Sequence, residues 1–158
     1  MKGGTPISDS YPCKSMEQPK DIPYRFSPGQ RAFLDAPRKA VIATLREDGT
    51  AAQSMVYYAR DGDTLWISAN PEGSKARDLR RDPRVSFLVF ADDVPAYLAI
   101  EGLAEVTDDV DTPDRVELMT RYLDREGALA EVEKKPKSRP NARLRIYPLR
   151  AFAFNIAG

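Results

Sequence analysis

Short runs of alternating apolar and polar residues dominate the middle and the end of this chain. Alternation of this kind is typical of strands that bury one face. Asp48-Gly49 and Asp61-Gly62 separate the first three runs, and both dipeptides favour tight hairpin turns, so these runs are expected to form an antiparallel meander. The predicted strands are residues 39–45, 51–59, 64–69, 85–90, 97–106, 144–147 and 151–154.

Helical signals are confined to a few short segments. Ser27-Pro28 supplies an N-cap and a first-turn proline, which predicts a helix that ends near Ala36-Pro37. A basic helix is predicted to open at Ser74, with the serine hydroxyl as its N-cap, and to stop before Asp82-Pro83. A third helix starts at Thr112-Pro113, and residues 127–135 continue it or form a separate turn.

Six or seven short antiparallel strands with few helices predict a mainly β (α+β) fold, a small closed or nearly closed barrel with peripheral helices. This domain is expected to span residues 27–158. Residues 1–26 contain four prolines and two glycines with little apolar periodicity, so an irregular N-terminal arm is expected there. Gly102, inside the run 97–106, is predicted to mark a bulge or a close backbone approach.

Composition narrows the chemistry. The chain has 158 residues, and its 24 Lys and Arg balance its 24 Asp and Glu, so no net charge favours nucleic acid or an anionic membrane surface. Histidine is absent, which excludes Ser-His-Asp and Cys-His catalysis and histidine-ligated zinc. Cys13 is the only cysteine, so neither an intramolecular disulfide nor a metal site is expected. Any chemistry must therefore come mostly from a bound cofactor.

The chain shows no apolar run of membrane-spanning length and no apolar core of a signal peptide. Together with the cysteine usage, this leads us to expect a cytoplasmic protein without a membrane partner.

Positive charge is concentrated in residues 74–84. Ser74 and Lys75 follow the turn-rich loop Asn70-Pro71-Glu72-Gly73, so free N–H groups, the positive end of a helix dipole and an ammonium would meet at one point. Such a point can bind a phosphate. A solvated basic helix without a ligand is the alternative. Four arginines follow within ten residues, enough for a ligand with several negative charges: Arg77, Arg80, Arg81 and Arg84.

Residues 74–85 resemble the K-x-R-N-L-R-R-D-P-R signature of the pyridoxamine 5'-phosphate oxidase-like, FMN-binding split barrels, and most of all the branch that uses the deazaflavin coenzyme F420. The likeness continues in register through residues 41–45, 54–58, 86–89 and 100–106. The resemblance implies a six- to seven-stranded antiparallel split barrel. It also implies a homodimer with the cofactor at the subunit interface.

The resemblance also implies which residues contact the cofactor. In the family the lysine of the signature grips the cofactor phosphate, and Lys75 matches it. An arginine often precedes that lysine, whereas Ser74 stands here, so the phosphate cradle would depend on Ser74, backbone N–H groups and Arg77 or another arginine. Tyr97 stands where pyridoxamine phosphate oxidases carry a glutamine that contacts the ring. Two strand segments lie along the flavin ring in the family: Ser54, Met55 and Val56, and Ser68, Ala69 and Asn70. For these strand residues and for Tyr97, ordinary packing is the alternative.

By this resemblance the protein is expected to be an F420-dependent oxidoreductase that passes a hydride to an electron-poor acceptor such as an enone or a quinone. Its proton donor would be a tyrosine, a lysine or water. An FMN-dependent oxidase or reductase, or a non-catalytic flavin or deazaflavin carrier, is the alternative. Oxidation of pyridoxamine phosphate is not expected, because residues 144–158 lack the Trp- and Arg-bearing substrate motif of those enzymes.

Overall fold

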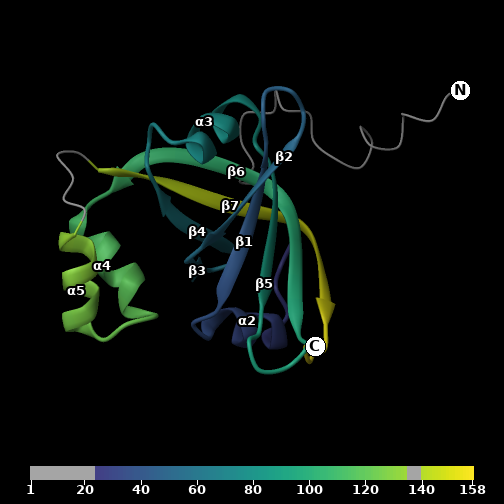
Figure 1. The fold of residues 1–158 in the computed structure, drawn as a ribbon. Helices are drawn as coiled ribbons and strands as arrows, with labels where there is room; N and C mark the ends of the chain where they lie inside the picture. The colour runs from purple at the N-terminus through teal and green to yellow at the C-terminus, as the bar shows by residue number, and fades with distance from the viewer. Residues whose placement is uncertain (1–23, 135–139) are drawn as a thin grey trace, which may run out of the picture.

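Seven strands form one antiparallel sheet in the computed structural model, which describes residues 24–134 and 140–158. Figure 1 shows the sheet curled around its core, with two long strands, β6 and β7, running side by side. The strand order is β2-β1-β5-β6-β7-β4-β3. The strands are β1 (Lys39–Leu45), β2 (Ala51–Val56), β3 (Ala59–Asp61), β4 (Thr64–Ala69), β5 (Arg84–Phe90), β6 (Tyr97–Val110) and β7 (Asn141–Phe154).

This architecture confirms the mainly β fold class. The sheet is open rather than closed, because β2 and β3 lie at opposite ends of the strand order and do not pair. The molecule is thus a split barrel. Its interior holds one cluster of buried side chains that includes Leu65, Phe87 and Ile100. Phe26, from the predicted arm, also belongs to this core, whereas residues 1–23 lie outside the described residues.

Four helices lie at the periphery of the sheet in the described part of the chain: α2 (Pro28–Asp35), α3 (Ser74–Arg81), α4 (Thr112–Thr120) and α5 (Arg125–Glu133). A capping box between Ser27 and Gln30 starts α2, as its sequence predicts. Asp111, rather than Thr112, is the N-cap of α4. Helix α5 does not continue α4 but is a separate helix with Asp124 as its own N-cap. No helix among the described residues is long and apolar enough to cross a membrane.

The predicted three-stranded meander is wrong, because the chain leaves the sheet between Val56 and Ala59. Tyr58 is fully buried, and its hydroxyl donates to the Leu34 carbonyl at 2.8 Å. Its backbone N–H donates to the Tyr122 hydroxyl at 3.2 Å, and its carbonyl accepts from Arg121 Nε at 2.8 Å. These side chains replace a neighbouring strand as hydrogen-bond partners. The single predicted run 51–59 is therefore two strands, which pair at opposite edges of the sheet.

The two C-terminal strands predicted from the sequence are one continuous strand, β7. Its pairing with β6 shifts register between Glu101 and Gly102, at the point where Gly102 faces Pro148. A Cβ at Gly102 would lie only 2.2 Å from the Tyr147 carbonyl oxygen. The predicted bulge and close approach at Gly102 are thus confirmed, and the bulge accommodates a proline that cannot donate to the ladder.

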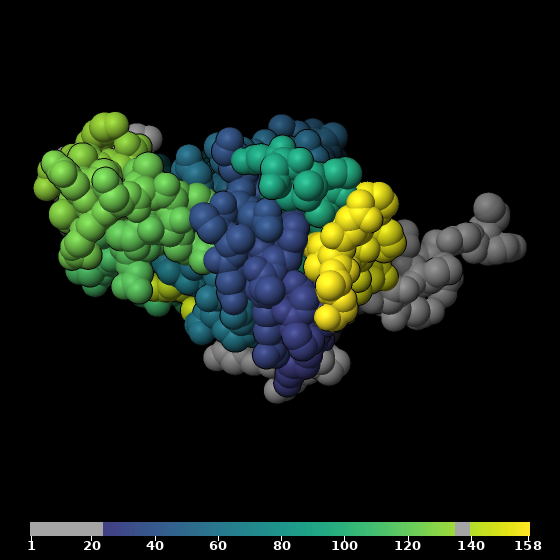
Figure 2. Space-filling model, turned by 90° about the horizontal axis from the view of Figure 1, so that it is seen from below, coloured from purple at the N-terminus to yellow at the C-terminus, as the bar shows by residue number. Residues whose placement is uncertain are grey.

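The α4–α5 hairpin forms a second, smaller packing unit. Val116, Ala128 and Val132 make up its buried cluster, with Met119 packed against it, separate from the main core. Figure 2 shows this green hairpin on the opposite side of the molecule from the yellow end of β7. The hairpin thus stands beside the sheet rather than closing it.

Candidate cofactor-binding site

Helix α3 begins directly after a tight loop that follows β4. In this loop the Asn70 side-chain oxygen accepts from the Glu72 N–H at 3.0 Å, and the Gly73 N–H donates to the Asn70 carbonyl at 2.9 Å. The N-cap is Gly73, with no side-chain cap, and Ser74 is the first helical residue. The predicted N-cap role of Ser74 is therefore wrong, because the loop turn places the extended backbone one residue earlier.

Two cavities meet at Lys75, which lines both. The first, of about 400 Å³, lies between α3 and the β1–β2 hairpin. The second, of about 350 Å³, lies between the strand ends of β2 and β4 and the α4–α5 hairpin. We call them the α3 cavity and the hairpin cavity. Every residue predicted to contact the cofactor, except Tyr97, lines one of them: Ser54 and Ser74 the α3 cavity, Met55, Val56, Ser68, Ala69 and Asn70 the hairpin cavity, and Lys75 both.

The α3 cavity is lined mainly by polar and positively charged groups. Lys75 and Arg77 face it from α3, and Arg46 faces it from the β1–β2 turn. Within residues 24–134 and 140–158, neither Lys75 nor Arg77 takes part in an ion pair. The first hydrogen bond inside the helix runs from Arg77 N–H to the Gly73 carbonyl at 3.1 Å, so the N–H groups of the preceding helical residues have no intrahelical acceptor. These groups together can receive an anion.

The remaining arginines of the basic segment form ion pairs and hydrogen bonds within the fold. Arg80 pairs with Asp108 at 2.9 Å and also donates to the Pro71 carbonyl at 2.6 Å. Arg84 makes a two-pronged pair with Asp82, at 3.0 and 2.8 Å. The expectation that the whole arginine cluster would bind a ligand is thus too broad, because Arg80 and Arg84 are already paired with aspartates. A run of charges in a sequence does not reveal which of them already have carboxylate partners in the fold.

Asp78 fixes α3 to the sheet from beneath. It is 5% exposed, and one of its oxygens accepts from the Thr44 hydroxyl of β1 at 3.3 Å. Its other oxygen pairs with Arg81 at 3.3 Å, and Arg81 in turn donates to the Leu45 carbonyl. This network attaches the middle and the C-terminal end of α3 to β1, and it thereby holds the helix that carries Lys75 against the sheet.

The hairpin cavity combines strand residues with a wall that the sequence did not predict to line the site. Leu118 and Met119 of α4 and Val132 of α5 supply apolar surface, and Arg115 and Glu131 supply charges. Met119 also packs against the small buried cluster of the hairpin. Its position depends on the way in which the hairpin stands against the sheet, and helical periodicity alone does not carry that information.

Two tyrosine hydroxyls near this cavity, those of buried Tyr58 and partly buried Tyr122, are hydrogen-bonded to the backbone. Burial raises the pKa of Tyr58, whose hydroxyl donates to Leu34. Burial also raises the pKa of Tyr122, whose hydroxyl lies 2.9 Å from the Arg38 carbonyl. Tyr57, in contrast, is 37% exposed and lines the cavity, with its ring 4.6 Å from that of Tyr122. Of these three tyrosines, only Tyr57 presents its side chain to a ligand there.

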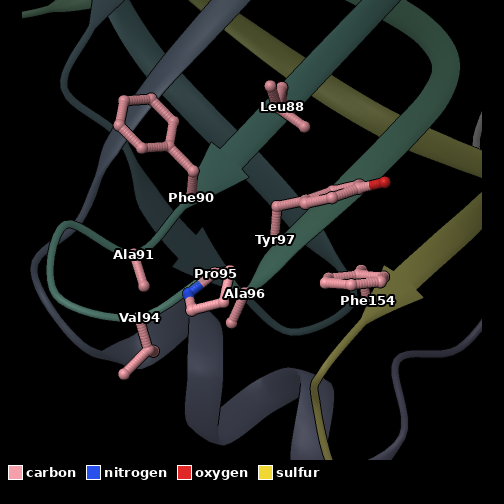
Figure 3. A pocket seen from close by; sticks show the side chains of 8 residues that line it. All are labelled: Leu88, Phe90, Ala91, Val94, Pro95, Ala96, Tyr97 and Phe154. Carbon is pink, nitrogen blue, oxygen red and sulfur yellow. The ribbon is translucent and has the colours of Figure 1, made fainter.

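Tyr97 lies in a third hollow, of about 260 Å³, whose lining is almost entirely apolar (Figure 3). Its ring stacks on Phe154 at 5.4 Å between centroids. In the sheet, Tyr97 lies opposite Phe90, and Phe90 lies opposite Lys39, the first residue of β1. Helix α3 contacts Leu45, the last residue of β1, through Arg81. The two ends of β1 are six residue steps apart, which corresponds to roughly 20 Å along an extended strand. Within one chain, Tyr97 is therefore not part of the Lys75 cavities.

Fold and site together define a split-barrel protein with a cavity pair suited to an anionic, ring-bearing cofactor. The family model described as pyridoxamine 5'-phosphate oxidase matches residues 26–154, and the chain belongs to this family. The family includes oxidoreductases that bind flavins or related cofactors.

Solved structures similar to this chain carry several functional names. An F420 reductase matches with 24% identity over 80% of this chain and 98% of its own, at a TM-score of 0.65. A conserved hypothetical protein from Mycobacterium tuberculosis matches with 26% identity over 88% and 89% of the two chains, at a TM-score of 0.64. General Stress Protein 26 from Bacillus anthracis matches with 16% identity over 82% and 93%, at a TM-score of 0.61. At these identities the matches support the fold.

Proposed function

We propose that this protein is an F420-dependent oxidoreductase, which transfers a hydride from the reduced deazaflavin to an electron-poor conjugated acceptor such as an enone or a quinone. The observation that carries the proposal is the position of Lys75 at the junction of a basic cavity and a partly apolar one. A ligand with an anionic tail and a flat ring matches this pair of cavities better than a compact anion does.

The α3 cavity suits the tail of F420, which bears a phosphodiester and several carboxylates. Lys75 and Arg77 supply two positive charges, with Arg46 nearby. The helix N-terminus adds unpaired N–H groups and the positive end of its dipole. A monophosphate such as that of FMN would use one end of this surface, whereas an extended polyanion would use all of it.

The hairpin cavity suits the ring. Its strand wall consists of Met55, Val56 and Ala69, with Ser68 and Asn70 as polar groups at the edge. Its volume of about 350 Å³ lies within the range of small-molecule sites. When bound, the deazaflavin supplies the two-electron chemistry, and the protein holds the ring, anchors the tail and limits access of water. Tyr57 is our candidate proton donor, because it is the tyrosine that lines this cavity.

We also propose that the active form is a homodimer. Tyr97 and Phe154 form part of an exposed apolar surface far from Lys75 in the same chain. A second copy that packs on this surface would bury it and could bring the partner's Tyr97 toward the cofactor. The predicted contact of Tyr97 with the ring depends on such an arrangement.

Turnover distinguishes this proposal from a non-catalytic carrier. Purified protein would be mixed with chemically or enzymatically reduced F420 and a panel of quinones and enones, and reoxidation would be followed by absorbance. Protein-dependent reoxidation with at least one acceptor is the expected result, and Tyr57→Phe should slow the reduction of enones, which need a proton. Tight F420 binding with no turnover across the panel would favour the carrier. Turnover with reduced FMN alone would favour the FMN-dependent alternative.

A further inference from the structure

Two methionines line the hairpin cavity from different walls. Met55 belongs to strand β2 and is 52% exposed, although it is a large apolar side chain on a strand. Met119 belongs to helix α4 and is partly buried against the small cluster of the hairpin. Methionine is flexible and polarisable, and its thioether makes favourable contacts with aromatic rings. A pair of methionines is thus suited to pack against flat rings that differ in size and substituents.

The wall that carries Met119 is fixed at both of its ends. Next to the C-terminus of α4, Arg121 donates to the Tyr58 carbonyl at 2.8 Å, and the Tyr122 hydroxyl accepts from the Tyr58 N–H at 3.2 Å. Near the N-terminus of α4, Arg143 of strand β7 pairs with Asp114 at 3.3 Å. Between these attachments, Leu118 and Met119 face the cavity and not the main core. The hairpin is therefore a fixed wall with adaptable side chains.

We propose that Met55 and Met119 hold a flat, conjugated ring between strand β2 and the α4–α5 hairpin, and that Met119 sets which rings fit. This inference rests on the proposed function, since it concerns the cavity that the proposed function assigns to a ring. The ring could belong to the cofactor or to the acceptor. The shared chemistry is a flat apolar face, which the thioethers and the apolar surface of Leu118 and Val132 recognise.

Methyl NMR of the methionines tests the proposal without relying on catalysis. The chain has only four methionines, so the ¹³C-methyl spectrum of labelled protein is simple, and Met55→Leu and Met119→Leu identify the two signals. Three probes would be titrated separately: oxidised F420, menadione as a ring without a tail, and inorganic phosphate as an anion without a ring. Fluorescence would measure F420 binding on the same samples.

We expect ring-current shifts of both the Met55 and the Met119 methyl signals with F420 or with menadione, and none with phosphate. Shifts with F420 assign the ring to the cofactor, and shifts that need menadione assign it to the acceptor. If F420 binds by fluorescence but neither ring-bearing probe moves both methyls, the inference is overturned and the proposed function survives. If F420 does not bind, the proposed function fails, and the menadione titration alone decides the inference.

Substitutions provide a second test. Met119→Ala should weaken binding of the ring-bearing probe about tenfold, whereas Met119→Leu, which preserves volume, should restore most of the affinity. Leu129→Ala is the matched control, because Leu129 is exposed on the same hairpin and does not line the cavity. Met55→Ala repeats the test at a half-exposed strand position if Met119→Ala melts early. Unchanged affinity in both alanine variants would overturn the proposal.

Discussion

Lys75 acts at the residue scale through its place in a helix as well as through its charge. It is the second residue of α3, where the helix dipole and the unpaired N–H groups add to its ammonium. The network of Asp78, Thr44 and Arg81 holds that helix on β1, so the ammonium is presented from a rigid element. A preorganised cation of this kind binds phosphate more tightly than a lysine on a mobile loop.

Lys75→Ala should weaken F420 binding without unfolding the protein. A charge-assisted phosphate contact contributes roughly 1.5–3 kcal/mol, so about a ten- to hundredfold loss of affinity is expected. Fluorescence titration measures it, with a melting curve as a check on folding. Lys39→Ala is the control, because Lys39 is an exposed lysine at the far end of β1. An unchanged dissociation constant in Lys75→Ala would show that this residue belongs to a solvated helix face.

Gly102→Ala should destabilise the fold, because the new methyl group would lie 2.2 Å from the Tyr147 carbonyl oxygen of the neighbouring strand. The two longest strands would have to separate at their bulge, at a cost of about 1–3 kcal/mol or more. Urea unfolding measures this loss of free energy. A midpoint equal to that of the unaltered protein would mean that the strands move apart freely at this point.

The residues of the site differ in how far sequence predicts them. Lys75 and Ser74 are adjacent in one motif, so local pattern brings them together. Met119 and Arg115 reach the same site only because α4 stands against strands that are far away in sequence. The pairing of Arg80 with Asp108 is likewise a long-range contact, which is why the charge cluster was overestimated.

At the scale of elements, the hairpin turns and the cap of α2 were predictable because they depend on neighbouring residues, whereas the predicted cap at Ser74 was wrong by one residue. Ser27 starts α2 through its capping box, and Gly49 and Gly62 adopt positive φ in the expected turns. The break after β2 was not predictable, because it depends on Tyr122 and Arg121 bonding to the backbone of Tyr58 from more than sixty residues away. Apolar alternation continues through Tyr58, and only the tertiary structure removes it from the sheet.

The contact between α2 and β3 gives a pH-dependent contribution to stability. Hydrogen bonds from Arg60, at 2.7 Å to each oxygen, lower the pKa of Asp35 below its ordinary value. A lowered folded-state pKa means that the carboxylate stabilises the fold above the ordinary value of 3.8, and that this contribution is lost as the pH falls through the folded-state pKa. Because Asp35 is half exposed, the contribution is at most about 1 kcal/mol.

Asp35→Asn should therefore lower the free energy of unfolding at neutral pH and have little effect once the pH lies below the folded-state pKa of Asp35. Urea unfolding of both proteins across this pH range measures the difference. Asp93→Asn, at an exposed position in the β5–β6 loop, is the control. A difference that stays constant across the range would show that the lost interaction does not depend on the charge of Asp35.

At the scale of the whole molecule, the Lys75 cavities and the Tyr97 hollow lie toward opposite ends of the sheet. Residues 97–100 are all apolar or aromatic, and the barrel buries only some of them. Leu98 and Ile100 are fully buried, whereas Tyr97 faces outward beside Phe152 and Phe154, which are 61% and 42% exposed. An exposed aromatic surface of this kind is typical of an interface.

Phe152→Asp combined with Phe154→Asp should convert the proposed dimer into a monomer, because two carboxylates would have to be buried at the interface. Light scattering measures the mass, and F420 affinity should fall in parallel because the shared site is lost. Leu129→Asp on α5 is the control for an added surface charge. If the unaltered protein is a monomer that binds F420 fully, the shared site does not exist.

Side-by-side fluorescence titrations of the purified protein with F420 and with FMN, at one moderate salt concentration, test the central claim most directly. The claim is that the cavities on either side of Lys75 receive a deazaflavin ring and its polyanionic tail. We predict that F420 binds at least about tenfold more tightly than FMN, and that added salt narrows the gap because the tail contacts are ionic. Tighter binding of FMN, or protein purified with bound FMN, would contradict the claim.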